Sequence, residues 1–333
     1  MAKTILITGH AGLIGSKLAD WILENHPEYE VVGIDDLSDG FMSNVNQRVY
    51  SYYGDCGDVE LLNTVFVHHD IEYVFHFAAR AAESMAGFNR MFFHTNNIVT
   101  SANVINHCIK FDVKRLIFAS SMSVYGRNKA PFNEEQIPVP IDPYAVGKYA
   151  VELDLAAAHQ QHGLEYSIFR GHSIYSDKQN MWDRYRNVLS IWTRQALNGE
   201  PMTIYGSGLQ SRAFTFTDDI LPALWLCAVD DRTKNQTYNF GNDQRTSLID
   251  AIKIVSEVTG YRYIVHLPEI YEVQAAYCDH TKAKTELGLD CPTSLYDGYK
   301  VMWEWAKVQP KREVKTWDRF EIDNGLYDMW KSK

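Results

Sequence analysis

The sequence is poor in cysteine and has no long apolar run. Five of its 333 residues are cysteine, and none stands in the CxxC spacing of a zinc or redox site. We therefore expect reduced thiols and a cytoplasmic protein. No stretch approaches the roughly eighteen apolar residues of a membrane-spanning helix, and the apolar run before Gly9 is too short for a signal sequence. No membrane association is expected.

Basic residues are also in deficit. Lys and Arg number 32 against 42 Asp and Glu, which gives a net charge of −10. This sign is unfavourable for a surface that binds phosphate backbones, so we expect no nucleic-acid partner. With 46% apolar and 22% charged residues, the composition is that of a folded globular chain, and its length favours two lobes.

Short β-rich runs alternate with helical periodicity over the first 170 residues. The expected strands are 4–8, 31–35, 49–53, 73–77, 115–120 and 166–170, and the expected helices are 13–25, 59–68, 95–110 and 144–162. This alternation predicts an α/β fold: a doubly wound parallel Rossmann sheet over 1–170, followed by a smaller mixed lobe over 171–333. A strand at 237–240, within the segment 214–241, could return to the main sheet. We expect the aromatic C-terminal tail to pack onto the body.

Gly9, Gly12 and Gly15 form a glycine-rich turn between the first expected strand and a helix. Such glycines let the backbone approach a pyrophosphate, which the amino end of the new helix attracts. Twenty residues after Gly15, Asp35 ends the next strand. A carboxylate there accepts hydrogen bonds from the adenosine ribose and repels a 2′-phosphate, and Asp36 adds to that repulsion. The pattern predicts NAD rather than NADP.

Four Tyr-x-x-x-Lys pairs occur in the chain, and only Tyr144 with Lys148 has a fitting context. Pro143 suits the first turn of a helix, so Tyr144 and Lys148 fall on one helical face. The serine-rich stretch 120–126 ends the preceding strand, at the edge where open α/β sheets bind ligands. We therefore assign a function to this pair and treat those that begin at Tyr125, Tyr296 and Tyr327 as coincidental.

Together these motifs resemble those of the extended short-chain dehydrogenase/reductases, specifically the nucleotide-sugar epimerases and dehydratases, and most closely the UDP-glucose 4-epimerases. The resemblance covers about residues 1–310 and includes the stretches 76–79, 185–188, 201–206 and 210–214. It implies cofactor contacts from Gly9, Gly12, Leu13, Ile14, Gly15, Asp35, Asp36, Asp55, Cys56, Phe77, Ala78, Ala79, Asn97, Tyr144 and Lys148. It implies substrate contacts from Ser121, Ser123, Ser173, Asn187, Val188, Thr203, Tyr205, Arg212 and Ala276.

The resemblance also implies a mechanism. Tyr144 would remove the sugar O4 proton, Ser121 would assist that transfer, and Lys148 with the positive nicotinamide ring would lower the pKa of Tyr144. The expected reaction is NAD-dependent 4-epimerisation of UDP-glucose/galactose or UDP-GlcNAc/GalNAc by transient oxidation at C4. Related 4,6-dehydratases carry an Asp-Glu pair where this chain has Met122 and Ser123. Two alternatives stay open: an oxidoreductase that makes a 4-keto product, and a non-catalytic sugar-nucleotide-binding protein.

Three departures from the family pattern concern the substrate. Ser173 replaces a customary Asn, and residues 268–272 lack an arginine that commonly clamps the diphosphate, so Arg212 would carry more of that charge alone. Ala276 stands where a bulky residue restricts some epimerases to plain hexoses. It leaves room for an acetamido group unless Tyr175 or Tyr271 fills the space.

The histidine pairs His68-His69 and His159 with His162 lack a third ligand, so no metal site is expected. The alanine-rich face of the helix after Tyr144 fits close packing inside the domain or the helix-bundle dimer that the family uses. We favour a homodimer.

Overall fold

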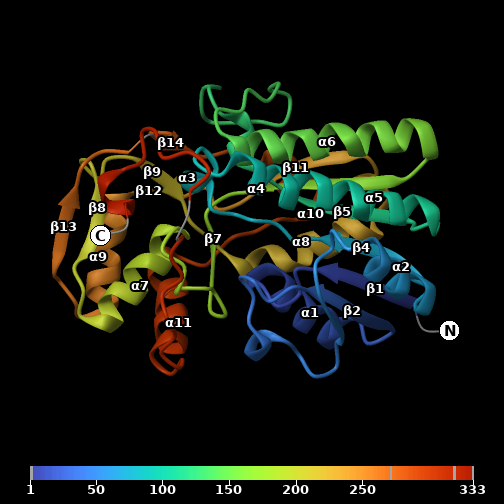
Figure 1. Cartoon of the computed structure of the whole chain (residues 1–333), viewed down its shortest axis with the longest axis horizontal. Helices are drawn as coiled ribbons and strands as arrows, with labels where there is room; N and C mark the ends of the chain where they lie inside the picture. Colours follow the sequence, from blue (N-terminus) through green and yellow to red (C-terminus); the bar gives the residue numbers. More distant parts are fainter. Residues whose placement is uncertain (1–2, 271, 318–319, 332–333) are drawn as a thin grey trace.

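A seven-stranded parallel sheet forms the centre of the computed structural model, which describes residues 3–270, 272–317 and 320–331 (Figure 1). Its strand order is β11-β6-β5-β4-β1-β2-β3. The strands are β1 (Lys3–Thr8), β2 (Tyr29–Asp35), β3 (Tyr50–Tyr53), β4 (Ile71–His76), β5 (Arg115–Ser121), β6 (Glu165–Gly171) and β11 (Gln236–Phe240). The chain order reverses between β1 and β4, which is where open α/β sheets bind ligands. The predicted α/β fold is confirmed.

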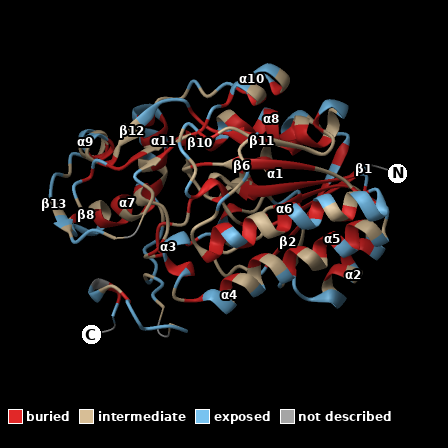
Figure 2. Cartoon of the chain, turned by 90° about the horizontal axis from the view of Figure 1, so that it is seen from above, coloured by how far each residue is buried: buried red, intermediate tan, exposed pale blue. Residues whose placement is uncertain are grey.

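Helices cover both faces of this sheet because its strands are apolar on both sides. Ile5 and Ile7 of β1 belong to the core under one face, and Leu6 belongs to the core under the other, as the two-residue period of a strand requires. The first face is covered by α1 (Leu13–Asn25), α8 (Thr217–Val229) and α10 (Thr281–Leu287), and the second by α2 (Val59–His68), α5 (Thr100–Lys110) and α6 (Pro143–His162). Figure 2 shows the buried strands between helices that each keep an exposed side.

A second lobe lies beside this unit in Figure 1. It contains α7 (Val188–Asn198), β8 (Met202–Tyr205), β9 (Ser211–Ala213), β12 (Arg245–Ser247), α9 (Leu248–Thr259), β13 (Ile264–Leu267), β14 (Ala275–Ala276) and α11 (Leu295–Lys307). Of these elements, α7, β8, α9, α11 and β13 pack around the fully buried Trp192 and Tyr299. Between the lobes, β7 (Ile174–Tyr175) pairs with β10 (Thr215–Phe216), after which the chain re-enters the first lobe as α8 and β11.

Short elements fill the connections near the sheet edge. They are α3 (Glu83–Ala86), α4 (Arg90–His94), the π-helical turn η2 (Thr95–Val99), and the 3-10 turns η1 (Met42–Asn44), η3 (Met122–Tyr125), η4 (Asp231–Thr233) and η5 (Asp328–Trp330). The single helix expected over 95–110 therefore begins as a π-helical turn. No helix in the described part of the chain has the length and apolar character needed to cross a bilayer.

Candidate active site

A cavity of about 900 Å³ lies at the carboxyl ends of the central strands, between the two lobes. Gly9 follows β1, Asp35 ends β2, Phe77 follows β4 and Ser121 ends β5, and all four line it. Its other wall comes from the second lobe. Except for Asn97, every residue that the sequence assigned to cofactor or substrate lines this one cavity.

The glycine-rich turn has the shape that a dinucleotide requires. A Cβ on Gly9, whose φ is +74°, would lie 2.8 Å from the Ala78 amide nitrogen, and one on Gly15 would lie 2.3 Å from the Gly9 carbonyl oxygen. Gly12 faces the cavity and begins α1 without a side-chain cap or an acidic residue in the first turn. The helix amino end is thus open to a phosphate, and the residues present fit an NAD pyrophosphate.

Asp35 and Asp36 have different partners at the end of β2. The Asp35 carboxylate accepts hydrogen bonds from the Ala11 amide at 2.9 Å and the Leu37 amide at 2.8 Å, which fixes its orientation. Asp36 forms an ion pair with Arg80 at 3.2 Å, so part of its expected repulsion toward a 2′-phosphate is neutralised. Arg80 also donates to Asp39 at 2.8 Å. We therefore expect Asp35, more than Asp36, to select NAD over NADP.

Asn97 is bonded to the loop that follows β4. It is 2% exposed and does not line the cavity. Its side-chain oxygen accepts from the Arg80 amide at 2.8 Å, and its side-chain nitrogen donates to the Arg80 carbonyl at 3.0 Å. Asn97 therefore holds the loop after β4 in place, and its contact with NAD stays a prediction.

Three hydroxyl groups form a chain at the carboxyl end of β5. The Ser123 hydroxyl donates to Ser121 Oγ over 3.0 Å, and Ser121 hydrogen-bonds to the Tyr144 phenol. One helical turn beyond Tyr144, the Lys148 ammonium donates to the Ala119 carbonyl at 2.7 Å and lies 5.8 Å from the centre of the tyrosine ring. The structure thus brings the predicted Ser121, Tyr144 and Lys148 together.

Within the protein itself, burial dominates the pKa values of Tyr144 and Lys148. Burial raises the pKa of Tyr144 above its ordinary value, and Glu83 adds to the rise, while the hydrogen bond from Ser121 opposes it. Burial also lowers the pKa of Lys148 to about 7, against the influence of Glu152. The predicted lowering of the Tyr144 pKa included the positive nicotinamide ring, and it stays a prediction for the protein with NAD bound.

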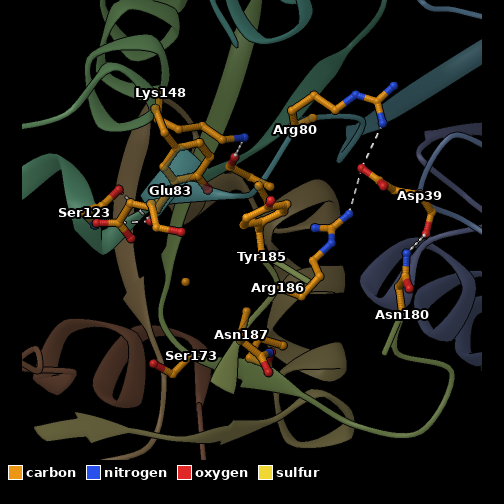
Figure 3. Close-up of a pocket in the computed structure, with 18 of the residues that line it drawn as sticks. Asp39, Arg80, Glu83, Ser123, Lys148, Ser173, Asn180, Tyr185, Arg186 and Asn187 are labelled. Carbon is orange, nitrogen blue, oxygen red and sulfur yellow. Dashed lines mark hydrogen bonds and ion pairs between the residues drawn. The ribbon is translucent and has the colours of Figure 1, made fainter. Parts of the chain in front are cut away.

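Glu83 is a site residue that the sequence reasoning missed. In Figure 3 its side chain lies beside Ser123, on the same side of the cavity as Lys148. Glu83 is exposed toward the cavity, and desolvation by the surrounding protein, with Asp142 contributing, raises the pKa of its carboxyl to about 7. A detectable signal was present, because Glu83 is an acidic residue in an alanine-rich run directly after a buried strand.

The expected role of Arg212 as the main phosphate cation is modified. Its guanidinium donates to Glu272 at 2.6 Å and to the Val273 carbonyl at 2.8 Å. Arg184 and Arg186 also line the cavity, and Arg186 reaches Asp39 of the first lobe at 2.9 Å (Figure 3). With Arg80, which also binds Asp39, these arginines therefore contribute positive charge to the cavity wall.

The wall near the expected sugar position is built from small side chains. Ala276 lines the cavity from β14, and Ser173 adopts the left-handed backbone region with a φ of 45°. Tyr175 is fully buried in the core of the second lobe and does not line the cavity. Tyr271, the other side chain considered for this space, lies outside the described residues.

His172, Cys278 and His280 form a buried group that sequence spacing did not reveal, since it weighed only neighbouring histidines. The Nδ1 atom of His172 contacts the Ala213 carbonyl, and that of His280 contacts Asp243. The two Nε2 atoms lie 2.6 Å apart, whereas two histidines on a tetrahedral zinc would hold them about 3.3 Å apart. We describe the group as a hydrogen-bonded histidine pair.

The remaining Tyr-x-x-x-Lys pairs do not assemble a second catalytic cluster. Tyr125 is buried and donates to Asn239, and Tyr296 is 38% exposed on α11. Tyr327 does reach the cavity wall, from the C-terminal tail, while Lys331 pairs with Asp328. The tail packs onto the body as expected, and Tyr327 and Trp330 line the cavity in addition.

A model of the NAD dependent epimerase/dehydratase family matches residues 5–241. The chain is similar to a UDP-glucose 4-epimerase of Thermotoga maritima, crystallised with UDP-glucose, at 33% identity and a TM-score of 0.86 over 91% of this chain and 98% of that one. It is also similar to a UDP-glucuronic acid 4-epimerase of Bacillus cereus in complex with UDP-glucuronic acid and NAD (27%, TM-score 0.83, 91% and 99%). A third relative is a UDP-N-acetylglucosamine 4-epimerase of Methanobrevibacter ruminantium in complex with UDP-N-acetylmuramic acid (28%, TM-score 0.83, 91% and 97%).

Proposed function

The chain belongs to the NAD dependent epimerase/dehydratase family, and we propose that it epimerises a UDP-hexose at C4. Membership of this family confirms the predicted family resemblance and the predicted NAD cofactor. The observation that carries the proposal is the convergence of Ser121, Tyr144 and Lys148 in the cavity that the glycine-rich turn opens into. A protein that only bound a sugar nucleotide would not need a positioned base.

Each residue of the cluster has a task in this reaction. Bound at the glycine-rich turn and Asp35, NAD would supply the hydride acceptor for the sugar C4. Tyr144 takes the O4 proton and gives it back, which is general acid–base chemistry. Ser121 donates to the Tyr144 phenol and orients it, and Lys148 is fixed by the Ala119 carbonyl close to the ring. Its position allows its charge to stabilise the phenolate.

The residues after Ser121 favour chemistry confined to C4. Met122 packs against a small apolar cluster, and the Ser123 hydroxyl donates its hydrogen bond to Ser121 Oγ. Neither side chain can remove a C5 proton or protonate a C6 hydroxyl as the dehydratase acid pair does. We therefore favour 4-epimerisation over dehydration and over release of a 4-keto sugar.

The substrate that we propose is a UDP-hexose, with N-acetylated UDP-hexosamines used at least as well as UDP-glucose. Ala276 and Ser173 present small side chains to the cavity, and Tyr175 is withdrawn into the core. An acetamido group at C2 needs such space, because a tight wall would impose a clash.

Product chromatography tests the function. UDP-, dTDP-, CDP- and GDP-sugars are incubated with the NAD-loaded protein, and products and NADH are measured. The expected result is interconversion of two UDP-sugar epimers with no net NADH. Stoichiometric NADH with a 4-keto sugar, a 4-keto-6-deoxy product, or no conversion of any sugar would contradict it.

We also propose a homodimer through α6. This helix exposes Val146 (41%) and Leu153 (56%), two apolar side chains seven residues apart, so they share one face. Light scattering should give twice the chain mass of 38.2 kDa, and Leu153→Glu should give the monomer. A monomeric wild type would contradict this arrangement.

A further inference from the structure

The C-terminal strap, defined as the described residues of 311–331, lies beyond the 1–310 region of family resemblance and runs from α11 along the junction of the two lobes (Figure 1). Near its start it is tied to both lobes. The Lys315 amide donates to the Trp182 carbonyl at 2.6 Å, and its ammonium donates to the Ser38 carbonyl at 2.8 Å. Arg312 lies 4.1 Å from the centre of the Phe41 ring.

Further along, hydrogen bonds join the strap to backbone groups of α4 and of Phe88. The Glu321 carboxylate accepts from the Met91 and Phe92 amides, each at 2.8 Å. The Ile322 amide donates to the Phe88 carbonyl at 3.1 Å. These bonds hold the strap in place, so that its last turn lies at the cavity wall.

That last turn brings two aromatic side chains to the cavity wall. Trp330 is 5% exposed, lies edge-on to Tyr185 at 5.2 Å and to Tyr327 at 4.9 Å, and hydrogen-bonds through its indole to the Tyr205 phenol. Tyr185 projects into the cavity in Figure 3. Tyr185, Tyr205, Tyr327 and Trp330 all line the cavity, so the strap completes an aromatic wall begun by the second lobe.

We propose that Tyr327 and Trp330 are substrate-binding residues that contact the nucleoside diphosphate part of the substrate. The proposal rests on the proposed function. The wall that they complete extends from Tyr144 of the catalytic cluster to Tyr205 and Arg184 of the second lobe. Arginines supply charge for the diphosphate, and aromatic rings supply flat apolar surface for the base, which stacks on such rings with little preference between bases.

Calorimetric titration with UDP and with NAD tests the proposal without requiring turnover. Tyr327→Ala and Trp330→Leu should each raise the Kd for UDP by about 10- to 100-fold, the usual effect of removing a stacking ring, and leave the Kd for NAD unchanged. Trp317→Phe is the matched control, because Trp317 belongs to the same strap but packs on Phe92 and does not line the cavity. It should bind UDP as the wild type does.

Tryptophan fluorescence gives a second measurement, which applies if Tyr327→Ala or Trp330→Leu fails to fold. UDP should change the tryptophan emission of the wild type, and Trp330→Phe should lose most of that change although seven of the eight tryptophans remain. UDP affinity within twofold of wild type in both Tyr327→Ala and Trp330→Leu, or an unaltered emission change in Trp330→Phe, would overturn the inference alone. A wild type that binds none of UDP, dTDP, CDP and GDP would overturn the proposed function as well.

Discussion

Ser123 Oγ lies 3.0 Å from Ser121 Oγ, and Ser121 passes its own proton toward the Tyr144 phenol. This direction is set by the start of η3, where Ser121 Oγ also accepts from the Ser123 amide at 3.2 Å. With its acceptor positions occupied, Ser121 is left to act as a donor. The serine-rich stretch therefore orients the tyrosine hydroxyl before any substrate arrives.

Tyr144→Phe should lower kcat by about 10²- to 10⁴-fold, the usual contribution of a positioned acid or base, with NAD affinity nearly unchanged. Steady-state kinetics and NAD titration measure both. The matched control is Tyr296→Phe, from another Tyr-x-x-x-Lys pair, whose ring is 38% exposed on α11. If Tyr296→Phe were the inactive variant instead, the assignment of Tyr144 would be wrong.

NAD should bind in strong preference to NADP, because Asp35 is fixed by the Ala11 and Leu37 amides at the end of β2. Arg80 is shared between Asp36 and Asp39 and is therefore not available to a 2′-phosphate. Calorimetry with each cofactor measures the ratio. Asp35→Asn should reduce the preference, and equal affinities in the wild type would contradict the role of Asp35.

Asp39→Asn should destabilise the protein by about 1–3 kcal/mol, the cost of removing a hydrogen-bonded charge from partly buried partners. Asp39 links Arg80 of the first lobe with Arg186 and with Lys315 of the strap. Although burial opposes them, these cations hold the pKa of Asp39 below its ordinary value. Its contribution is present above the unfolded pKa of about 3.9 and is lost as the pH falls through the lower folded value.

Urea unfolding at several pH values checks this prediction. The difference between wild type and Asp39→Asn should be full at neutral pH and should vanish at strongly acidic pH. Asp112→Asn, at an exposed turn with positive φ, is the control and should change stability little. A difference that grew as the pH fell would contradict the assignment of the ion pairs.

The sequence predicted those parts of the site in which one short motif marks both the end of a strand and the residues of the site. The glycine-rich turn, Asp35 and the 120–126 stretch each follow or end a buried strand, and parallel strands bring their carboxyl ends to one edge. This rule was sufficient to place them in one cavity. Asn97 alone does not line that cavity, and its bonds to Arg80, which hold the loop after β4, could not be predicted from the sequence.

The parts that were missed depend on contacts between distant segments. Asp39 forms ion pairs with Arg186 and Lys315. Trp330 contacts Tyr185 and Tyr205. No local sequence pattern predicts contacts between residues so far apart in the chain. The contribution of burial to the pKa of Tyr144 was also missed, because the sequence shows the charge of Lys148 but not the burial of the ring. Desolvation is a property of the folded surroundings.

Glu83→Gln should move the rising limb of the kcat/KM pH profile to lower pH. Ionised Glu83 raises the pKa of Tyr144, so removing its charge favours the phenolate at lower pH. The ionisation of Glu83 itself, at a pKa of about 7, should also disappear from the profile. Glu60→Gln, on the exposed first turn of α2, should leave the profile unchanged. A shift to higher pH in Glu83→Gln would contradict the proposed coupling.

Ala276→Tyr should restrict the substrate to plain hexoses. Ala276 lines the cavity from β14, and a tyrosine there would occupy the space that we assign to the C2 acetamido group. Overpacking of this kind costs about 1–3 kcal/mol, so the ratio of kcat/KM for UDP-GlcNAc to that for UDP-Glc should fall by about 10- to 100-fold. Ala275→Tyr is the matched control, because Ala275 is the other residue of the same short strand, points to the opposite face and does not line the cavity. Its ratio should stay at the wild-type value. A wild type that converts only UDP-Glc, or an Ala276→Tyr variant whose ratio is unchanged, would show that another side chain sets the size of the sugar.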